Sequence, residues 1–144
     1  MKIIVLIILA IVLAGAGAFF FLAQKSKAGA APGLVDGALA PCPSSPNCVS
    51  SEPGTPVSHA VVALPAAAWE KIPDMLDRHG ARLVEVREDY VAAEFSSKLM
   101  GYVDDVEFRK AADGVHVRSA SRVGYGDMGA NKKRVEALRA ALAE

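Results

Sequence analysis

The chain has 144 residues, of which 52% are hydrophobic, so it can form one modest domain beside an apolar N-terminal segment. It carries 16 basic and 16 acidic side chains, a formal net charge of zero at pH 7. Because the sequence lacks both a strong basic excess and interleaved aromatic and basic residues, we expect no nucleic-acid partner. The charge is unevenly spread, since residues 28–115 carry seven basic and thirteen acidic side chains, whereas 116–144 carry six and three. The C-terminal segment is therefore expected to pack against an acidic remainder.

Residues 1–27 are predicted to be a transmembrane anchor or a signal segment. Residues 3–23 carry no charge, and as a helix they would be about 30 Å long, the thickness of the hydrocarbon core of a bilayer. Small residues at 14–18 resemble an export cleavage site, but the apolar run continues to residue 23, which favours an uncleaved anchor. The short N-terminus predicts anchoring in the inner membrane with the C-terminal domain in the periplasm, or secretion to the periplasm if the segment is cleaved.

Residues 28–56 are predicted to be a linker followed by an irregular cap that contains both cysteines. This stretch holds six of the eight prolines and has no helical period. Cys42 and Cys48 lie in a segment expected outside the cytoplasm, where an even number of cysteines favours a disulfide. A redox-active or copper-binding pair is the weaker alternative, because the C-x-x-C spacing and neighbouring His or Met ligands are absent.

Residues 57–144 are predicted to form a globular α+β domain. The sequence indicates a first strand at 59–64 and then a helix from Pro65 to Arg78, which Pro73 should kink or delay.

Two hairpins and a final helix complete this domain. The first hairpin is predicted over 83–95 with its turn at 88–89, and the second over 102–123 with its turn at Asp113 and Gly114. Apolar residues at helical spacing predict a terminal helix that covers the sheet. The order β-α-β-β-β-β-α implies an antiparallel sheet of about five strands with helices on one face.

The second hairpin gathers charged side chains on one face. Successive side chains of a strand point to opposite faces, so Asp105 and Glu107 share a face with Arg118 and Arg122. Arg118 can reach Glu107 and Arg122 can reach Asp105, each with its guanidinium fork on the carboxylate. One interpretation is a solvated ladder of cross-strand ion pairs, worth about 0.2–1 kcal/mol per pair. In the other, one arginine and Tyr125 bind the carboxylate or phosphate of a ligand.

The glycine-rich segment 124–129 formally matches G-x-G-x-x-G between a strand and a helix. No second parallel strand follows that helix, so we expect neither a dinucleotide site nor any other cofactor. Asp127 is expected to cap the helix, and Asp104, on the other strand face, to bond to that helix or to Tyr125. The three histidines show no metal-binding spacing, so no metal site is predicted.

Three motifs stand out in the sequence: Cys-Pro-Ser-Ser-Pro-Asn-Cys-Val-Ser-Ser at 42–51, Leu-Met-Gly-Tyr-Val-Asp-Asp-Val-Glu-Phe at 99–108, and Val-Arg-Ser-Ala-Ser-Arg-Val-Gly-Tyr-Gly-Asp-Met-Gly-Ala-Asn-Lys-Lys-Arg at 117–134. In this order they resemble the domain-of-unknown-function 1499 family, and the resemblance covers residues 42–142. It implies a small domain, often exported or membrane-tethered in bacteria and also found in chloroplasts. It implies no activity.

The polar residues of these motifs are the candidate ligand contacts: Asp104, Asp105, Glu107, Arg118, Arg122, Tyr125, Asn131 and Arg134. Because no nucleophile, metal set or cofactor loop is recognisable, we expect a non-enzymatic, membrane-anchored domain outside the cytoplasm. Residues 3–23 would contact the membrane, and the domain would bind a small anionic ligand or an envelope protein partner. The alternative is an enzyme in which Asp104 or Glu107 acts as a base beside Arg118.

Overall fold

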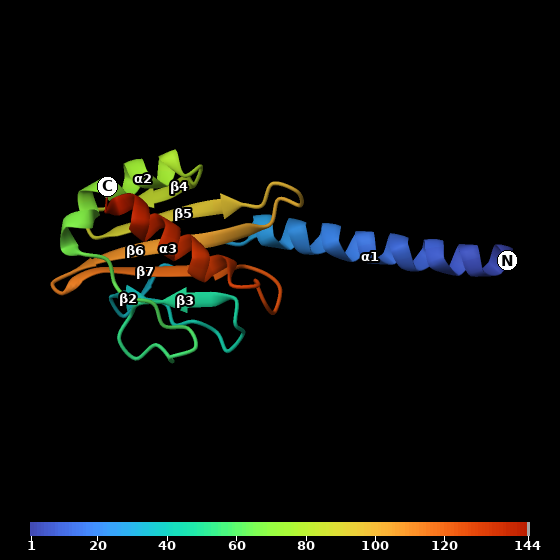
Figure 1. Ribbon diagram of the computed structural model, residues 1–144, viewed down its shortest axis with the longest axis horizontal. Helices are drawn as coiled ribbons and strands as arrows, with labels where there is room; N and C mark the ends of the chain where they lie inside the picture. The colour runs from blue at the N-terminus through green and yellow to red at the C-terminus, as the bar shows by residue number, and fades with distance from the viewer. Residues whose placement is uncertain (144) are drawn as a thin grey trace.

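The computed structural model describes residues 1–143 and contains a five-stranded antiparallel sheet with helices packed on one face (Figure 1). Its elements are α1 (Lys2–Ala28), β1 (Leu34–Val35), β2 (Ala38–Leu39), β3 (Cys48–Ser50), the 3-10 helix η1 (Ala66–Lys71), α2 (Ile72–Arg78), β4 (Arg82–Val86), β5 (Tyr90–Ser96), β6 (Val103–Ala111), β7 (Gly114–Ser121) and α3 (Ala130–Leu142). The strand order in the sheet is β3-β7-β6-β5-β4, and β1 pairs with β2 in a separate ribbon. The predicted α+β class and antiparallel sheet are confirmed.

Both predicted hairpins form. β4 pairs with β5 and β6 with β7, and Ala111 lies opposite Gly114 at the second turn. Gly114 has a φ of +143°, and a Cβ atom there would lie 2.7 Å from the carbonyl oxygen of Leu64. Leu64 exchanges two backbone hydrogen bonds with Val115, of 2.8 and 2.9 Å. Glycine is required at 114 because a side chain would clash with this approach.

The first strand of the sheet is Cys48–Ser50, and the prediction of a strand at 59–64 is wrong. Within the described residues, that later segment meets its neighbours through two isolated bridges, at residues 60 and 64. Between them the carbonyl oxygens of Val62 and Ala63 accept hydrogen bonds from Arg139 of α3. A helix side chain thus binds backbone groups that a neighbouring strand would otherwise pair.

The predicted helix is divided into two segments just before Pro73, in agreement with the predicted kink or delay. η1 ends at Lys71, and Pro73 lies in the first turn of α2, where its missing N–H removes no helical hydrogen bond. Together with α3 these segments cover one face of the sheet. The core on this face consists of apolar side chains with almost no exposed surface: Ile72, Leu76, Val106, Phe108, Val115, Val117, Val135 and Leu138.

The opposite face of the sheet is covered by residues 29–40, here termed the cover segment. Its β1–β2 ribbon places Leu39 against Tyr90 and Ala92. The N–H of Leu39 donates to Glu52 over 2.9 Å, and the same carboxylate accepts two hydrogen bonds from Arg109, of 2.8 and 2.7 Å. The charged strand face is therefore buried, so its interpretation as a solvated ladder is wrong. An irregular segment carries no periodic signal that would have predicted this cover.

α1 projects from the domain as a long helix (Figure 1). Among the described helices it is the one long and apolar enough to cross a membrane. Its last turns are attached to the domain, because Ala23 and Ser26 are buried. The hydroxyl of Ser26 donates to the carbonyl oxygen of Val103 (3.0 Å) and accepts from the N–H of the same residue (2.7 Å). α1 is thus clamped to the first residue of β6.

Cys42 and Cys48 form the predicted disulfide, and we expect it to stabilise the domain. It closes a short loop with a sequence separation of 6, for which the loss of chain entropy in the unfolded state corresponds to about 2–3 kcal/mol. A reducing agent should lower the urea unfolding midpoint of the wild type and leave that of a Cys42→Ala/Cys48→Ala variant unchanged. An unchanged wild-type midpoint, with both thiols free by chemical titration, would contradict this expectation.

Glu52 should make stability depend on pH in the acid range. Burial raises its pKa, but hydrogen bonds from Arg109 and Leu39 and nearby positive charge hold the pKa below its usual range. Its ionised form therefore contributes stability that is complete above the unfolded-state pKa of about 4.3 and is lost as the pH falls through the lower folded-state value. Glu52→Gln should be less stable than the wild type by about 1–3 kcal/mol at pH 7, and the difference should shrink in acid.

Chemical denaturation across the pH range would measure this difference. Glu88→Gln, at an exposed turn position, is the matched control and should follow the wild-type curve. A gap between Glu52→Gln and wild type that stays constant from neutral to strongly acidic pH would rule out this contribution of Glu52.

Candidate functional site

The candidate ligand contacts fall into two clusters on opposite faces of the sheet. The buried charge cluster, beneath the cover segment, contains Asp105, Glu107, Arg118 and Arg122. The helix-side cluster, between α3 and the sheet, contains Asp104 and Ser119 of the sheet and Asn131 and Arg134 of α3. Tyr125 is exposed in the loop between β7 and α3 and belongs to neither cluster. Strand alternation explains the division, because neighbouring residues of β6 and β7 face opposite ways.

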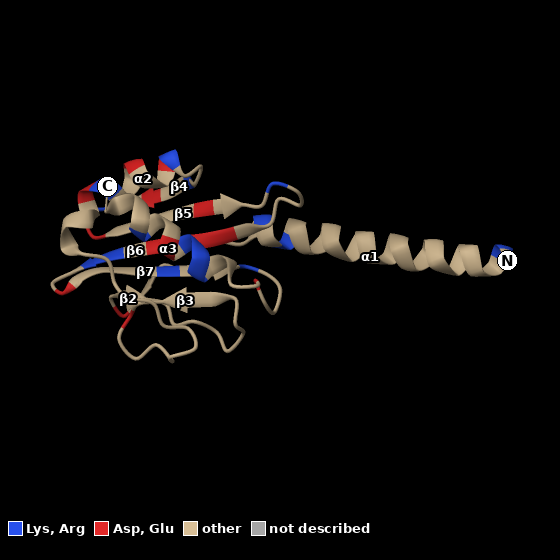
Figure 2. Cartoon of the chain, viewed as in Figure 1, with Lys and Arg blue, Asp and Glu red and all other residues tan. Residues whose placement is uncertain are grey.

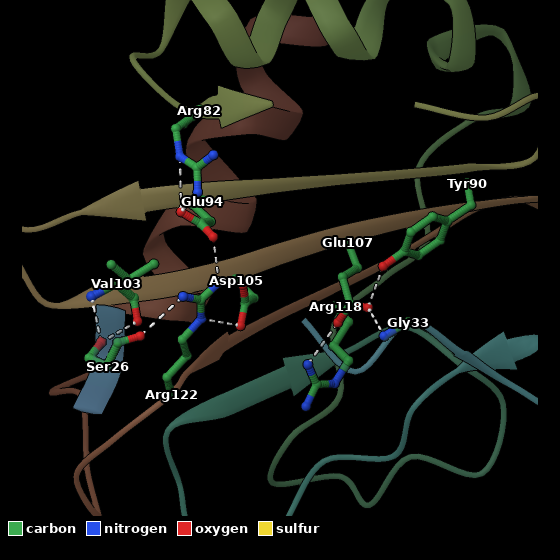
Figure 3. Close-up of polar contacts among 10 residues, drawn as sticks. All are labelled: Ser26, Gly33, Arg82, Tyr90, Glu94, Val103, Asp105, Glu107, Arg118 and Arg122. Atoms are coloured by element: carbon green, nitrogen blue, oxygen red, sulfur yellow. Dashed lines mark hydrogen bonds and ion pairs between the residues drawn. The ribbon is translucent and has the colours of Figure 1, made fainter. Parts of the chain in front are cut away.

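Glu107 is completely enclosed, with 0% of its side-chain surface exposed. One carboxylate oxygen accepts hydrogen bonds from the Tyr90 hydroxyl (2.7 Å) and the Gly33 N–H (2.9 Å), and the other accepts from Nη1 of Arg118 (2.9 Å) (Figure 3). Burial raises the pKa of Glu107, although Tyr90 and Arg118 act in the opposite direction. To use this carboxylate as a base, a substrate would have to displace its present partners.

Arg122 makes more side-chain hydrogen bonds than the other members of the buried charge cluster. Its Nε and Nη2 bind the two carboxylate oxygens of Asp105 over 2.8 and 2.6 Å, and Nη2 also binds Glu94 over 2.7 Å. Its Nη1 donates to the carbonyl oxygen of Ser26 in α1, over 3.0 Å (Figure 3). Hydrogen bonds to Asp105 and Glu94 raise the pKa of Arg122. The predicted pairs Arg122–Asp105 and Arg118–Glu107 are both confirmed.

The helix-side cluster joins α3 to the sheet. Arg134 binds Asp104 over 2.6 Å and also donates to Ser119 and Asn131, so the predicted bond between Asp104 and the last helix is confirmed. Gly129 is the N-cap residue of α3. Asp127, two residues earlier, accepts from the backbone N–H groups of Gly129 (2.9 Å) and Asn131 (2.8 Å), so its side chain satisfies a free N–H in the first turn of the helix, as a capping residue does. Burial raises the pKa of Asp127, but these backbone hydrogen bonds outweigh that effect and lower it. These groups bind one another, which is the pattern of a structural brace.

Four partners of the buried charge cluster were not among the predicted site residues: Ser26, Gly33, Tyr90 and Glu94. Tyr90 and Glu94 lie on β5 at positions of equal parity, so strand alternation places both on the charged face. The same rule that identified Asp105 and Glu107 would have found them. Ser26 and Gly33 lie outside the sheet, and no local pattern marks them.

A pocket of about 280 Å³ lies between the cover segment and β7. Its lining includes Lys25, Arg118 and Arg122 as cations and Asp105 as an acid. Arg122 and Asp105 bind each other, whereas Nε of Arg118 is buried and has no hydrogen-bond partner among residues 1–143. Lys25 is exposed at the end of α1. Arg118 therefore lines this pocket and also carries a buried donor that no described residue uses.

Arg122 should be essential for stability. Arg122→Ala would leave Asp105 buried without its counter-charge and the partly buried Glu94 with Arg82 alone. We expect it to lower the free energy of unfolding by about 3–5 kcal/mol. Arg122→Lys keeps the charge but loses the forked contact, so its loss should be smaller. Urea unfolding would measure both.

The control is Arg78→Ala, which removes an exposed ion pair with Asp74 on α2 and should cost at most about 1 kcal/mol. Equal losses for Arg122→Ala and Arg78→Ala would mean that the buried network contributes no more than a surface pair.

Comparison with known proteins gives a family and no activity. The family described as "Protein of unknown function (DUF1499)" matches residues 38–142, which include β3 to β7, both clusters and α3. No curated protein and no solved structure matches the chain. The match covers most of the sequence and agrees with the resemblance of the three motifs. The chain therefore belongs to the DUF1499 family.

Proposed function

We propose that the protein is a membrane-anchored domain outside the cytoplasm that binds a small anion between the cover segment and β7. The observation that carries this proposal is Arg118, whose side chain is only 7% exposed and whose Nε lacks a partner among the described residues. A buried donor without an acceptor costs about 1–3 kcal/mol. An anion in the adjoining pocket would supply the acceptor.

The proposed placement rests on α1 and on the disulfide. α1 has the length and composition of a membrane span, and a disulfide persists in compartments such as the periplasm. Together they support an inner-membrane anchor with the domain on the periplasmic side.

The lining of the pocket favours a phosphate or carboxylate group. Arg122 and Asp105 neutralise each other, so the remaining donors are those of Arg118 and the ammonium group of Lys25. A guanidinium edge binds planar or tetrahedral oxyanions well. A volume of about 280 Å³ suits a small ion better than a large cofactor. Because Arg118 is recessed, these contacts also favour a small ligand over a protein surface.

Binding can be tested with the full chain in zwitterionic detergent micelles. Inorganic phosphate, sulfate and citrate should raise the thermal unfolding midpoint, and calorimetry should give their affinities. Lys25→Ala removes the exposed cation, and Arg118→Lys keeps the charge beside Glu107 while removing the Nε donor. We expect each to weaken anion binding by about five- to tenfold.

Lys132→Ala is the matched control, because it removes an exposed lysine of α3 that does not line the pocket, and it should bind anions as the wild type does. Stabilisation by no anion, or equal affinities for wild type, Lys25→Ala and Arg118→Lys, would disprove the proposed site. Capture of an envelope protein that is insensitive to Lys25→Ala would then support a partner-binding function.

A further inference from the structure

Two loops that flank α1 expose large apolar side chains. Residues 97–102 connect β5 to β6 and include Leu99, 91% exposed, and Met100. Residues 122–129 connect β7 to α3 and include Tyr125 and Met128, which is 97% exposed. Both loops lie at the end of the sheet from which α1 projects (Figure 1). Apolar groups gathered at one end of a domain mark an interaction surface.

Contacts with α1 fix the height of the first loop along the helix. The hydroxyl of Tyr102 donates to the carbonyl oxygen of Phe19 over 3.2 Å, and Gly101 lies against the side chain of Lys27. Phe19 lies four residues before the end of the apolar run, which corresponds to about 6 Å along the helix axis. If α1 spans the bilayer, the loop at 97–102 is therefore at the depth of the boundary between head groups and acyl chains.

The charges around these loops are those expected at the surface of a membrane. Lys25 and Lys27 lie in the last turns of α1, and Lys98 lies in the first loop (Figure 2). Lysines beside exposed apolar residues attract anionic lipid head groups while the apolar side chains enter the acyl boundary. Tyr102 and Tyr125 are of the amphipathic kind that is enriched at this interface.

We propose that the loops at 97–102 and 122–129 insert into the membrane interface on either side of α1 and seat the domain directly on the lipid bilayer. The partner is the lipid surface, because the patch is continuous with the helix that would span it. This inference rests on the membrane anchor of the proposed function but not on an anion at Arg118. It assigns the apolar loop residues, which neither cluster uses, to contact with lipid.

The test uses tryptophan fluorescence of the full chain in nanodiscs. Leu99→Trp and Met128→Trp place a reporter in each loop, and both positions are exposed, so the substitutions should leave the thermal unfolding midpoint unchanged. The control is Val86→Trp. Val86 is at the end of β4 that lies far from α1 and from Val103, the first residue of β6. The native Trp69 is buried beside Lys110 at that remote end and supplies a constant reference.

Phospholipids brominated on their acyl chains should quench the Leu99→Trp and Met128→Trp signals by about half, as expected for a depth of about 5–10 Å. The signals of Val86→Trp and of the parent protein should hardly change. Equal quenching in all variants, or none in the loop variants, would overturn the proposal. A blue-shifted loop signal that bromine does not quench would also overturn it, because it would place a protein surface, such as a second copy, over the loops.

Discussion

The burial of charged side chains beneath the cover segment is the constraint on which the rest of the structure depends. Removing an arginine and a carboxylate from water is unfavourable unless each finds a partner of suitable geometry. On this face of the sheet Glu107 meets Arg118, and Asp105 meets Arg122, which directly follows β7. Tyr90 and Glu94 of β5 add hydrogen bonds from within the sheet. Others come from outside it, since Gly33 donates to Glu107 and the carbonyl of Ser26 accepts from Arg122. These outside bonds form in one placement of the cover segment and the end of α1.

The parts of the fold that could be predicted are those governed by local periodicity. Alternation along β6 and β7 predicted both the hairpin and the identity of its ion pairs. The turn predicted at Asp113-Gly114 lies one residue earlier, at Ala112 and Asp113, because Gly114 already pairs with Ala111. The prediction failed where the backbone is bonded by distant groups. Segment 59–64 is a short apolar run of the kind found in buried strands, yet two of its carbonyls bind Arg139, seventy-six and seventy-seven residues away in sequence. The cover segment is held by single hydrogen bonds without periodicity, so the burial of the charged face was not predictable either.

The glycine-rich motif at 117–134 illustrates how adjacent residues acquire different tasks. Arg118 and Ser119 are neighbours, but one faces the cover segment and the other faces α3. Asp127 caps α3 through backbone hydrogen bonds, which gives the segment a structural explanation without a nucleotide. Tyr125, in the middle of the motif, contacts neither cluster. A motif that appears to be one site in the sequence is thus divided among a buried ion pair, a helix brace and an exposed loop.

The attachment of α1 has a geometric consequence for function. A helix joined to a domain by a flexible linker leaves the domain free to tumble, whereas Ser26 is bonded to Val103 and to Arg122 through its hydroxyl and its carbonyl. The orientation of the sheet relative to α1 is therefore fixed within the chain, before any contact with lipid. Lys25 lies only two residues beyond the apolar run, about 3 Å along the helix axis. With α1 in a bilayer, the pocket that Lys25 shares with Arg118 would lie at the membrane surface. There the pocket would be open both to anions of the head-group layer and to anions of the adjoining solution.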